Sequence, residues 1–131
     1  MDILAPVDGS DCSYRALEFA TELVQRYDGT LHVVHVTDQR GETAETVLER
    51  ATEILDRAGV ADDPEIVTDV RLDEPRYANR VGEHVLDLVE ERGYGHVAMG
   101  HHGAGAVERV ILGSAAETVV RAAETPATII P

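Results

Sequence analysis

The chain has no lysine, no tryptophan and a single cysteine, Cys12, and each absence narrows the range of functions. One cysteine excludes an internal disulfide framework and suits a reducing compartment. The lack of lysine excludes the P-loop type of phosphate site, which needs a lysine after its glycines. No apolar run reaches the ~18 residues of a membrane-spanning helix, and the first residues lack the basic segment of a signal peptide. We therefore expect a soluble cytoplasmic protein.

Negative charge dominates the composition. There are 25 acidic residues against 11 basic ones, all of them arginine, and the formal net charge is −14. Such a surface repels nucleic acid and anionic membranes, so neither is expected as a partner. In about 1 M salt the Debye length falls to ~3 Å, which screens the self-repulsion. We interpret the acidity as adaptation to a high-salt, halophilic cytoplasm; the alternative is an acidic protein of ordinary habitat.

Short apolar segments alternate with amphipathic helical patterns along the 131 residues, a length that suits one globular domain. The predicted strands are residues 3–7, 31–36, 66–72, 96–99 and 127–130. The predicted helices run from a cap at Ser10 or Asp11 to Gly29, and over residues 43–58, 77–92 and 114–124. This alternation implies a parallel sheet covered on both faces, with right-handed crossovers. Ligands of such sheets bind beyond the carboxyl ends of the strands.

The most informative motif lies near the C-terminus. It reads Met99-Gly100-His101-His102-Gly103, then nine residues, then Gly113-Ser114. Glycines permit positive φ or a close backbone approach to a ligand, and the N-terminus of the following helix favours an anion. The spacing predicts a phosphate cradle, and the plainer alternative is three turn glycines. If the first and fourth strands are neighbours, Asp8 faces this loop as a ligand contact; it could equally be a turn residue that accepts local N–H groups.

Two features of the motif region, and Cys12 near the N-terminus, also need an interpretation. Ser114-x-x-Glu117 has the form of a capping box, in which the Ser114 hydroxyl bonds the backbone N–H of Glu117. His101 and His102 look like half of a metal site. No cysteine or acidic residue stands at a diagnostic spacing from them, so no metal ligand is predicted. Cys12 is most simply a small buried residue.

The glycine spacing after a strand ending in Met99 resembles the nucleotide-binding signature of the universal stress protein family. Other segments agree with the resemblance. They are Ile3-Leu4-Ala5-Pro6-Val7-Asp8-Gly9-Ser10, Leu31-His32-Val33-Val34-His35-Val36, Leu112-Gly113-Ser114-Ala115-Ala116-Glu117 and Thr125-Pro126-Ala127-Thr128-Ile129-Ile130. The resemblance spans essentially the whole chain and implies a single universal stress protein domain over residues 1–131.

The family resemblance implies a Rossmann-like fold of the adenine nucleotide alpha hydrolase type. This is an open five-stranded parallel sheet in the order 3-2-1-4-5 with helices on both faces. It further implies a homodimer, and the last strand, 127–130, would form the interface because an unpaired apolar edge strand seeks a partner. The implied ligand is ATP, in the subclass that keeps the full glycine signature, with Mg²⁺ or Mn²⁺ bridging the phosphates.

Matched residue by residue, the resemblance assigns binding roles at strand ends and at the last helix. The adenosine would be held by Pro6, Val7 and Asp8, with the adenine pocket lined by Val36. The ribose and phosphates would be wrapped by Met99, Gly100, His101 and Gly103. The outer phosphates would meet backbone N–H groups and a hydroxyl at Gly113, Ser114 and Ala115.

The motif offers no general base beside the phosphates, so no catalytic residue is predicted. The expected function is that of a nucleotide-binding stress-response or regulatory protein, acting as a homodimeric switch. The alternatives are a dimeric interaction module that binds no nucleotide, and a slow ATPase or phosphotransfer enzyme.

Overall fold

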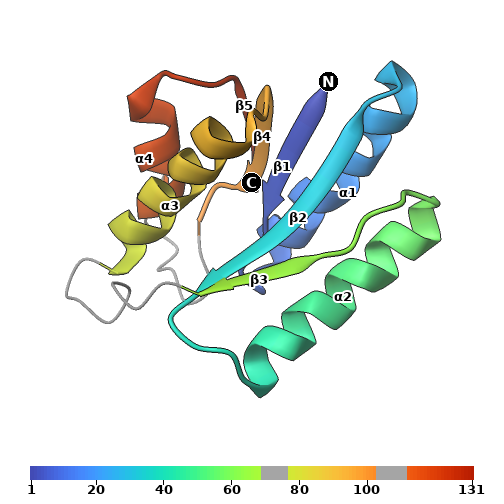
Figure 1. Cartoon of the computed structure of the whole chain (residues 1–131), viewed down its shortest axis with the longest axis horizontal. Helices are drawn as coiled ribbons and strands as arrows, with labels where there is room; N and C mark the ends of the chain where they lie inside the picture. Colours follow the sequence, from blue (N-terminus) through green and yellow to red (C-terminus); the bar gives the residue numbers. More distant parts are fainter. Residues whose placement is uncertain (69–76, 103–111) are drawn as a thin grey trace.

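The structure, a computed structural model, describes residues 1–68, 77–102 and 112–131 (Figure 1). Its strands are β1 (Asp2–Pro6), β2 (Thr30–Thr37), β3 (Glu65–Thr68), β4 (His96–Gly100) and β5 (Ala127–Ile130). Its helices are α1 (Asp11–Tyr27), α2 (Glu42–Ala58), α3 (Tyr77–Arg92) and α4 (Ser114–Ala122). Within the described ranges, none of these helices combines the length and apolar character needed to cross a bilayer.

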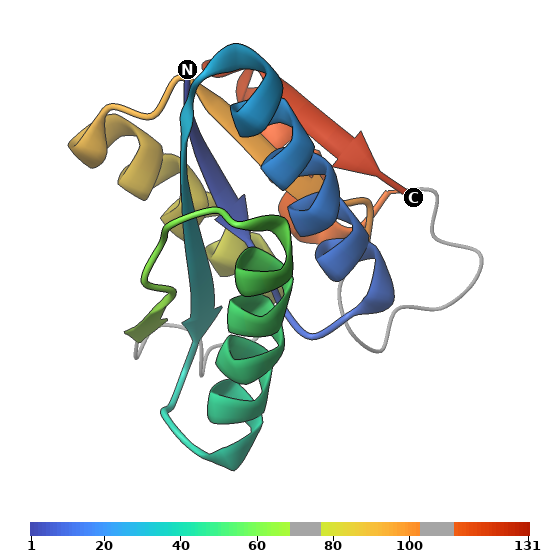
Figure 2. The same cartoon turned by 90° about the vertical axis from the view of Figure 1, so that its right-hand side faces the viewer.

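The strands form one parallel sheet in the order β3-β2-β1-β4-β5, which confirms the predicted topology. Helices α1 and α2 cover one face, and α3 and α4 cover the other (Figure 1). The view in Figure 2 shows α1 and α2 side by side in front of the sheet. Because β2 and β4 flank β1 on opposite sides, the strand order reverses between β1 and β4, where ligands of open α/β sheets bind.

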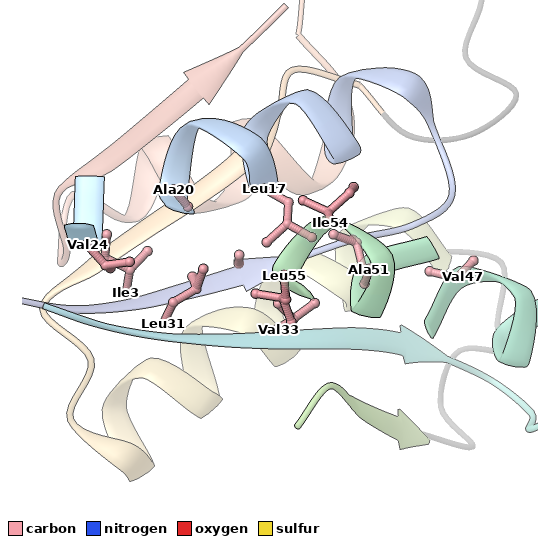
Figure 3. Packing of buried hydrophobic residues seen from close by; sticks show 13 residues of the cluster. Ile3, Leu17, Ala20, Val24, Leu31, Val33, Val47, Ala51, Ile54 and Leu55 are labelled. Carbon is pink, nitrogen blue, oxygen red and sulfur yellow. The ribbon is translucent and has the colours of Figure 1, made fainter. Parts of the chain in front are cut away.

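Alternation along β1 divides the hydrophobic core between the two faces of the sheet. Ile3 and Ala5 belong to the cluster under α1 and α2, whereas Leu4 belongs to the cluster under α3 and α4. Figure 3 shows the first cluster, to which α1 contributes Leu17 and α2 contributes Leu55 over the strands. Burying such a side chain contributes about 1.5–3 kcal/mol. Burial on both faces explains why residues 3–6 of β1 form a continuous apolar run.

The ends of some elements differ from the predicted boundaries for identifiable backbone reasons. Helix α1 ends at Tyr27, and its C-cap residue Asp28 adopts the left-handed conformation with φ 53°, one residue before the predicted stop at Gly29. Gly29 is required for space, because a Cβ there would overlap the carbonyl oxygen of Met1. Helix α4 ends early because Ala123 is left-handed, with φ 52°. Strand β3 begins at Glu65, and residues 69–72 of the predicted strand lie outside the described residues.

An ionic network joins β2, β3 and the end of α3. His32 Nδ1 lies 2.8 Å from Asp62 Oδ1, and His32 Nε2 lies 2.9 Å from Glu65 Oε2. Carboxylates only accept hydrogen bonds, so both ring nitrogens carry protons in this arrangement and His32 is an imidazolium. The Arg92 guanidinium donates to both oxygens of Glu65, at 2.8 and 3.1 Å. The network therefore consists of charge-assisted bonds, which are stronger than neutral ones.

The same contacts shift the pKa values of the network. The Arg92 hydrogen bonds, followed by that of His32, lower the pKa of Glu65 to about 2. Burial by itself lowers the pKa of His32, but the hydrogen bonds to Asp62 and Glu65 outweigh it and the net pKa is raised. The protonated ring consequently stabilises the fold below the ordinary histidine pKa of about 6.5, and this contribution is lost as the pH rises through the folded-state pKa.

We expect His32→Gln to destabilise the protein more at about pH 6 than at about pH 9, because only the lower pH retains the charged ring. Urea unfolding of wild type and variant at both pH values measures the difference. The contribution of Glu65 to stability does not affect this comparison, since it is lost only as the pH falls toward about 2.

His96→Gln is the matched control. Burial lowers the pKa of His96, so its pH dependence has the opposite sign and removing the ring costs less at the lower pH. An equal loss of stability in His32→Gln at both pH values would show that the ring is not charged in the folded protein.

Candidate functional site

A cleft opens where the carboxyl ends of β1 and β4 lie side by side. Ile3 pairs with His96 and Leu4 with Val97, so the turn after β1 and the loop after β4 reach the same edge of the sheet. The cavity has a volume of about 260 Å³. This is close to the lower end of the ~300–1,000 Å³ of small-molecule sites. The geometry agrees with the sequence prediction that Asp8 and the glycine motif face each other.

Most of the predicted site residues line this cleft. They are Pro6, Val7, Asp8, Val36, Met99, Gly100, Gly113, Ser114 and Ala115. His101 is not part of the lining, although its neighbour His102 is, and Gly103 lies outside the described residues. The fold thus gathers residues from β1, β2, β4 and α4 into one cavity, and their roles in binding remain predictions.

Other lining residues were missed by the sequence reasoning. They are Ser13, His35, Val81, His102 and Ala116. His35 is buried, and its Nδ1 lies 2.7 Å from the carbonyl oxygen of Val7, which only accepts, so Nδ1 carries the proton. The position of His35 near the carboxyl end of a predicted strand could have identified it as a residue of the cleft. Val81 reaches the cleft from α3, and the sequence shows that it lies on an apolar helix face but not what that face contacts.

Gly100 permits a close approach between two elements. A Cβ at this position would lie 2.6 Å from Cys12 Sγ and 2.9 Å from the backbone nitrogen of Ser13. The first turn of α1 therefore lies directly against the end of β4. The left-handed conformation occurs instead at Gly9, with φ 90°, in the turn after β1. The structure thus gives a reason for glycine at position 100 that the sequence did not indicate, the close packing of α1 on β4.

Asp8 shapes its own turn and also lines the cleft. Its Oδ1 accepts from the backbone N–H of Ser10 at 2.9 Å and from the Ser10 hydroxyl at 2.5 Å. The backbone N–H of Asp8 donates to Ser13 Oγ at 3.3 Å. The turn interpretation is therefore confirmed. An ionised carboxylate has about four acceptor sites, so the turn role leaves capacity for a ligand.

The predicted capping box at Ser114 is wrong. Gly113 is the N-cap residue of α4, with no side-chain capping bond, and Ser114 is the first helical residue. The backbone N–H of Glu117 donates to the carbonyl of Gly113 at 2.8 Å, as in any first helical turn. The Glu117 carboxylate instead pairs with Arg121 at 2.7 Å. A capping box would require Ser114 to precede the first helical residue, but α4 begins one residue earlier, at Ser114 itself. The exposed Ser114 side chain therefore remains at the cleft.

The N-terminus of α4 supplies the cleft with a favourable site for negative charge. The first N–H groups of a helix have no acceptor within it, and they carry the positive end of the helix dipole. Gly113 donates its N–H to the carbonyl of His101 at 2.6 Å. Ser114, Ala115 and Ala116 all line the cleft. Pro6, Val36 and Met99 form apolar parts of the same cavity, which therefore combines an apolar wall with a helix N-terminus.

We expect Gly100→Ala to destabilise the protein by about 1–3 kcal/mol, the usual cost of overpacking, because the added Cβ meets backbone atoms of α1 that cannot move independently. Chemical unfolding measures the loss. Gly95→Ala, in the loop before the same strand, is the matched control: its Cβ would meet no atom of the described residues within 4 Å, and the change should stay within about 0.5 kcal/mol. Equal stability of Gly100→Ala and wild type would contradict the close approach.

Comparison with known proteins gives consistent matches. The sequence model of the universal stress protein family matches residues 1–131. A universal stress protein of Methanocaldococcus jannaschii is 26% identical over 140 residues, which cover 98% of this chain and 80% of that protein.

Solved structures share the fold. The universal stress protein of Archaeoglobus fulgidus in complex with dAMP has a TM-score of 0.75 at 22% identity, over 100% of this chain and 98% of that one. A universal stress protein in complex with cAMP has a TM-score of 0.77 at 19% identity, over 99% of this chain and 95% of that one.

Proposed function

Because the chain belongs to the universal stress protein family, we propose that it binds an adenine nucleotide, ATP foremost, in the cleft between β1, β4 and α4. The observation that carries the proposal is the lining of one cavity by apolar strand ends and by the N-terminus of α4. An apolar wall suits the base, and a helix N-terminus suits phosphate. The dAMP and cAMP complexes of two relatives with the same fold support adenine nucleotides as the ligand class.

In the proposed complex, adenosine contacts the ends of β1 and β2, at Pro6, Val7, Asp8 and Val36. The ribose and phosphates follow the glycine motif, through Met99, Gly100, His101 and Gly103. The outer phosphates meet the start of α4, at Gly113, Ser114 and Ala115. The chain has no lysine and a net charge of −14. A Mg²⁺ or Mn²⁺ ion bound with the phosphates would offset the repulsion between this protein and a polyanionic ligand.

We propose that nucleotide binding serves a cytoplasmic stress-response or regulatory function, as a conformational or dimer switch. The single free cysteine suits the cytoplasm, and the acidic composition suits a high-salt one. A slow ATPase or phosphotransfer enzyme is a second candidate. Phosphate release faster than about one turnover per minute would favour the enzyme. This threshold is low, because even slow ordinary enzymes reach ~1 s⁻¹.

For the nucleotide site, we expect Gly113→Val and Ser114→Glu each to weaken ATP binding at least about tenfold, the equivalent of about 1.4 kcal/mol. The valine would block the approach to the helix start. The glutamate would repel phosphate, yet an acidic residue at this exposed first helical position favours the helix. Isothermal titration calorimetry with ATP and Mg²⁺ in molar KCl measures the affinity, and circular dichroism checks the fold.

Gly41→Val is the matched control for Gly113→Val. Gly41 is also a helix N-cap without a side-chain capping bond, and within the part of the chain that the structure describes a Cβ there would meet nothing within 4 Å. It should bind ATP like wild type. Absence of binding heat in wild type, or unchanged affinity in both cleft variants, would favour the interaction module that binds no nucleotide.

We also propose that two copies of the chain pair through β5, which is an edge strand of the sheet. The backbone N–H of Val97 donates to Pro126, and that of His101 donates to Ile130, so alternate residues of this segment bond β4. Residue 129 lies between them in the alternation, and its backbone groups point to the open edge. An unpaired edge of this kind can accept the same strand of a second copy.

For the dimer, we expect wild type to have twice the 14.2 kDa mass of one chain, and Ile129→Pro to be a folded monomer, because proline removes the outward N–H. Sedimentation equilibrium measures the masses. Ile129→Ala is the control, since it shortens the side chain but keeps the N–H, and it should remain dimeric. A dimer that persists in Ile129→Pro would place the interface elsewhere.

A further inference from the structure

Cys12 and His102 lie 90 positions apart in the sequence, yet they meet beside the cleft together with His101. The potential ligand atoms of the three side chains all lie within 4.8 Å of one another. Cys12 Sγ is 3.8 Å from His102 Nδ1. A tetrahedral zinc ion, with bonds of about 2.3 Å to sulfur and about 2.0 Å to nitrogen, holds such atoms about 3.5 Å apart. The observed spacing therefore needs only a small side-chain adjustment to enclose a metal ion.

One ring nitrogen of His101 is not used in hydrogen bonding within the described part of the chain. This atom, Nδ1, is buried and has no hydrogen-bond partner among the residues that the structure describes. The backbone of His101 is held on both sides, because its N–H donates to Ile130 and its carbonyl accepts from Gly113. A buried polar atom without a partner costs free energy, which a bound metal ion would remove. The orphaned nitrogen is thus an observation separate from the clustering of the three residues.

Cys12 is positioned for a metal by the contact between α1 and β4. The side chain is buried, and its Sγ lies 3.2 Å from the carbonyl oxygen of His102, to which the thiol donates in the absence of metal. Its place in the first turn of α1 puts the sulfur where a helix N-terminus favours negative charge. His102 is only partly buried and lines the cleft, which offers the ion a route from solvent.

We propose that Cys12, His101 and His102 form a binding site for a soft divalent metal ion, Zn²⁺ foremost. One thiolate and two neutral imidazoles suit Zn²⁺, whereas Mg²⁺ and Mn²⁺ prefer oxygen ligands. On binding, the Cys12 thiol releases its proton to solvent and each imidazole donates a ring lone pair, so no oxidation or reduction is involved. Three protein ligands leave the fourth tetrahedral position to a water molecule. This site is separate from the Mg²⁺ or Mn²⁺ proposed with the nucleotide.

The test is a titration of the reduced protein with Co²⁺, without nucleotide or Mg²⁺. We expect about one Co²⁺ per chain, with a sulfur-to-cobalt charge-transfer band and the intense visible bands of tetrahedral coordination. Zn²⁺ should displace the cobalt and abolish both features, whereas excess Mg²⁺ should not.

Three variants locate the site. Cys12→Ser should remove the charge-transfer band, and it and His102→Ala should each weaken Zn²⁺ binding at least about 100-fold, since even loss of an outer-shell partner costs 10–100-fold. His96→Gln, at the opposite end of β4, is the matched control and should bind like wild type. If Cys12→Ser fails to fold, His102→Ala, at a partly exposed position, decides the matter.

Two outcomes would overturn the proposal. One is cobalt binding without a charge-transfer band, which would place the ion on surface carboxylates. The other is wild-type Zn²⁺ affinity in folded Cys12→Ser or His102→Ala. Because the titration contains no nucleotide, its result is independent of the ATP-binding experiment.

Discussion

The contact between the first turn of α1 and the end of β4 organises this molecule. It exists because Gly100 has no Cβ: the space that one would occupy is already taken by Cys12 Sγ and by backbone atoms of α1. The helix can therefore lie directly over the carboxyl end of the strand. A larger residue at position 100 would push α1 away from β4 and separate the turn after β1 from the loop after β4.

Both candidate sites depend on that contact. The pairing of β1 with β4 brings Asp8 and the glycine motif to one edge of the sheet, and Ser13 and Gly100, which meet at the contact between α1 and β4, both line the cleft. The cluster of Cys12, His101 and His102 needs the helix turn to touch the residues after β4. The two proposed sites adjoin at His101 and His102, yet their chemistry differs. Helix amides and apolar strand ends suit a nucleotide, whereas sulfur and imidazole suit a soft metal ion.

Local signals predicted the fold well because they follow from the periods of helices and strands. Strand β5 and helix α3 have the predicted bounds. Gly93, directly after α3, adopts a positive φ of 76° that ends the helix. The errors arise where one residue type serves several backbone roles. Gly29 looks like a helix stop, but Asp28 takes the left-handed conformation. Ser114 and Glu117 have the spacing of a capping box, but the helix begins one residue earlier than that motif requires.

The sequence by itself determined the parallel α/β architecture, because alternating apolar runs and amphipathic helices bury their hydrophobic surfaces in few other ways. It also determined the glycine motif and the acidic surface, which are properties of composition and spacing. Only the tertiary structure decided which side chains meet. The spacing of residues along the chain indicated no further metal ligand near His101 and His102. The packing of α1 on β4 brings Cys12 to them, although it lies 90 positions before His102 in the sequence. Periodicity reports which face of an element is buried, but the identity of its neighbour depends on how whole elements pack.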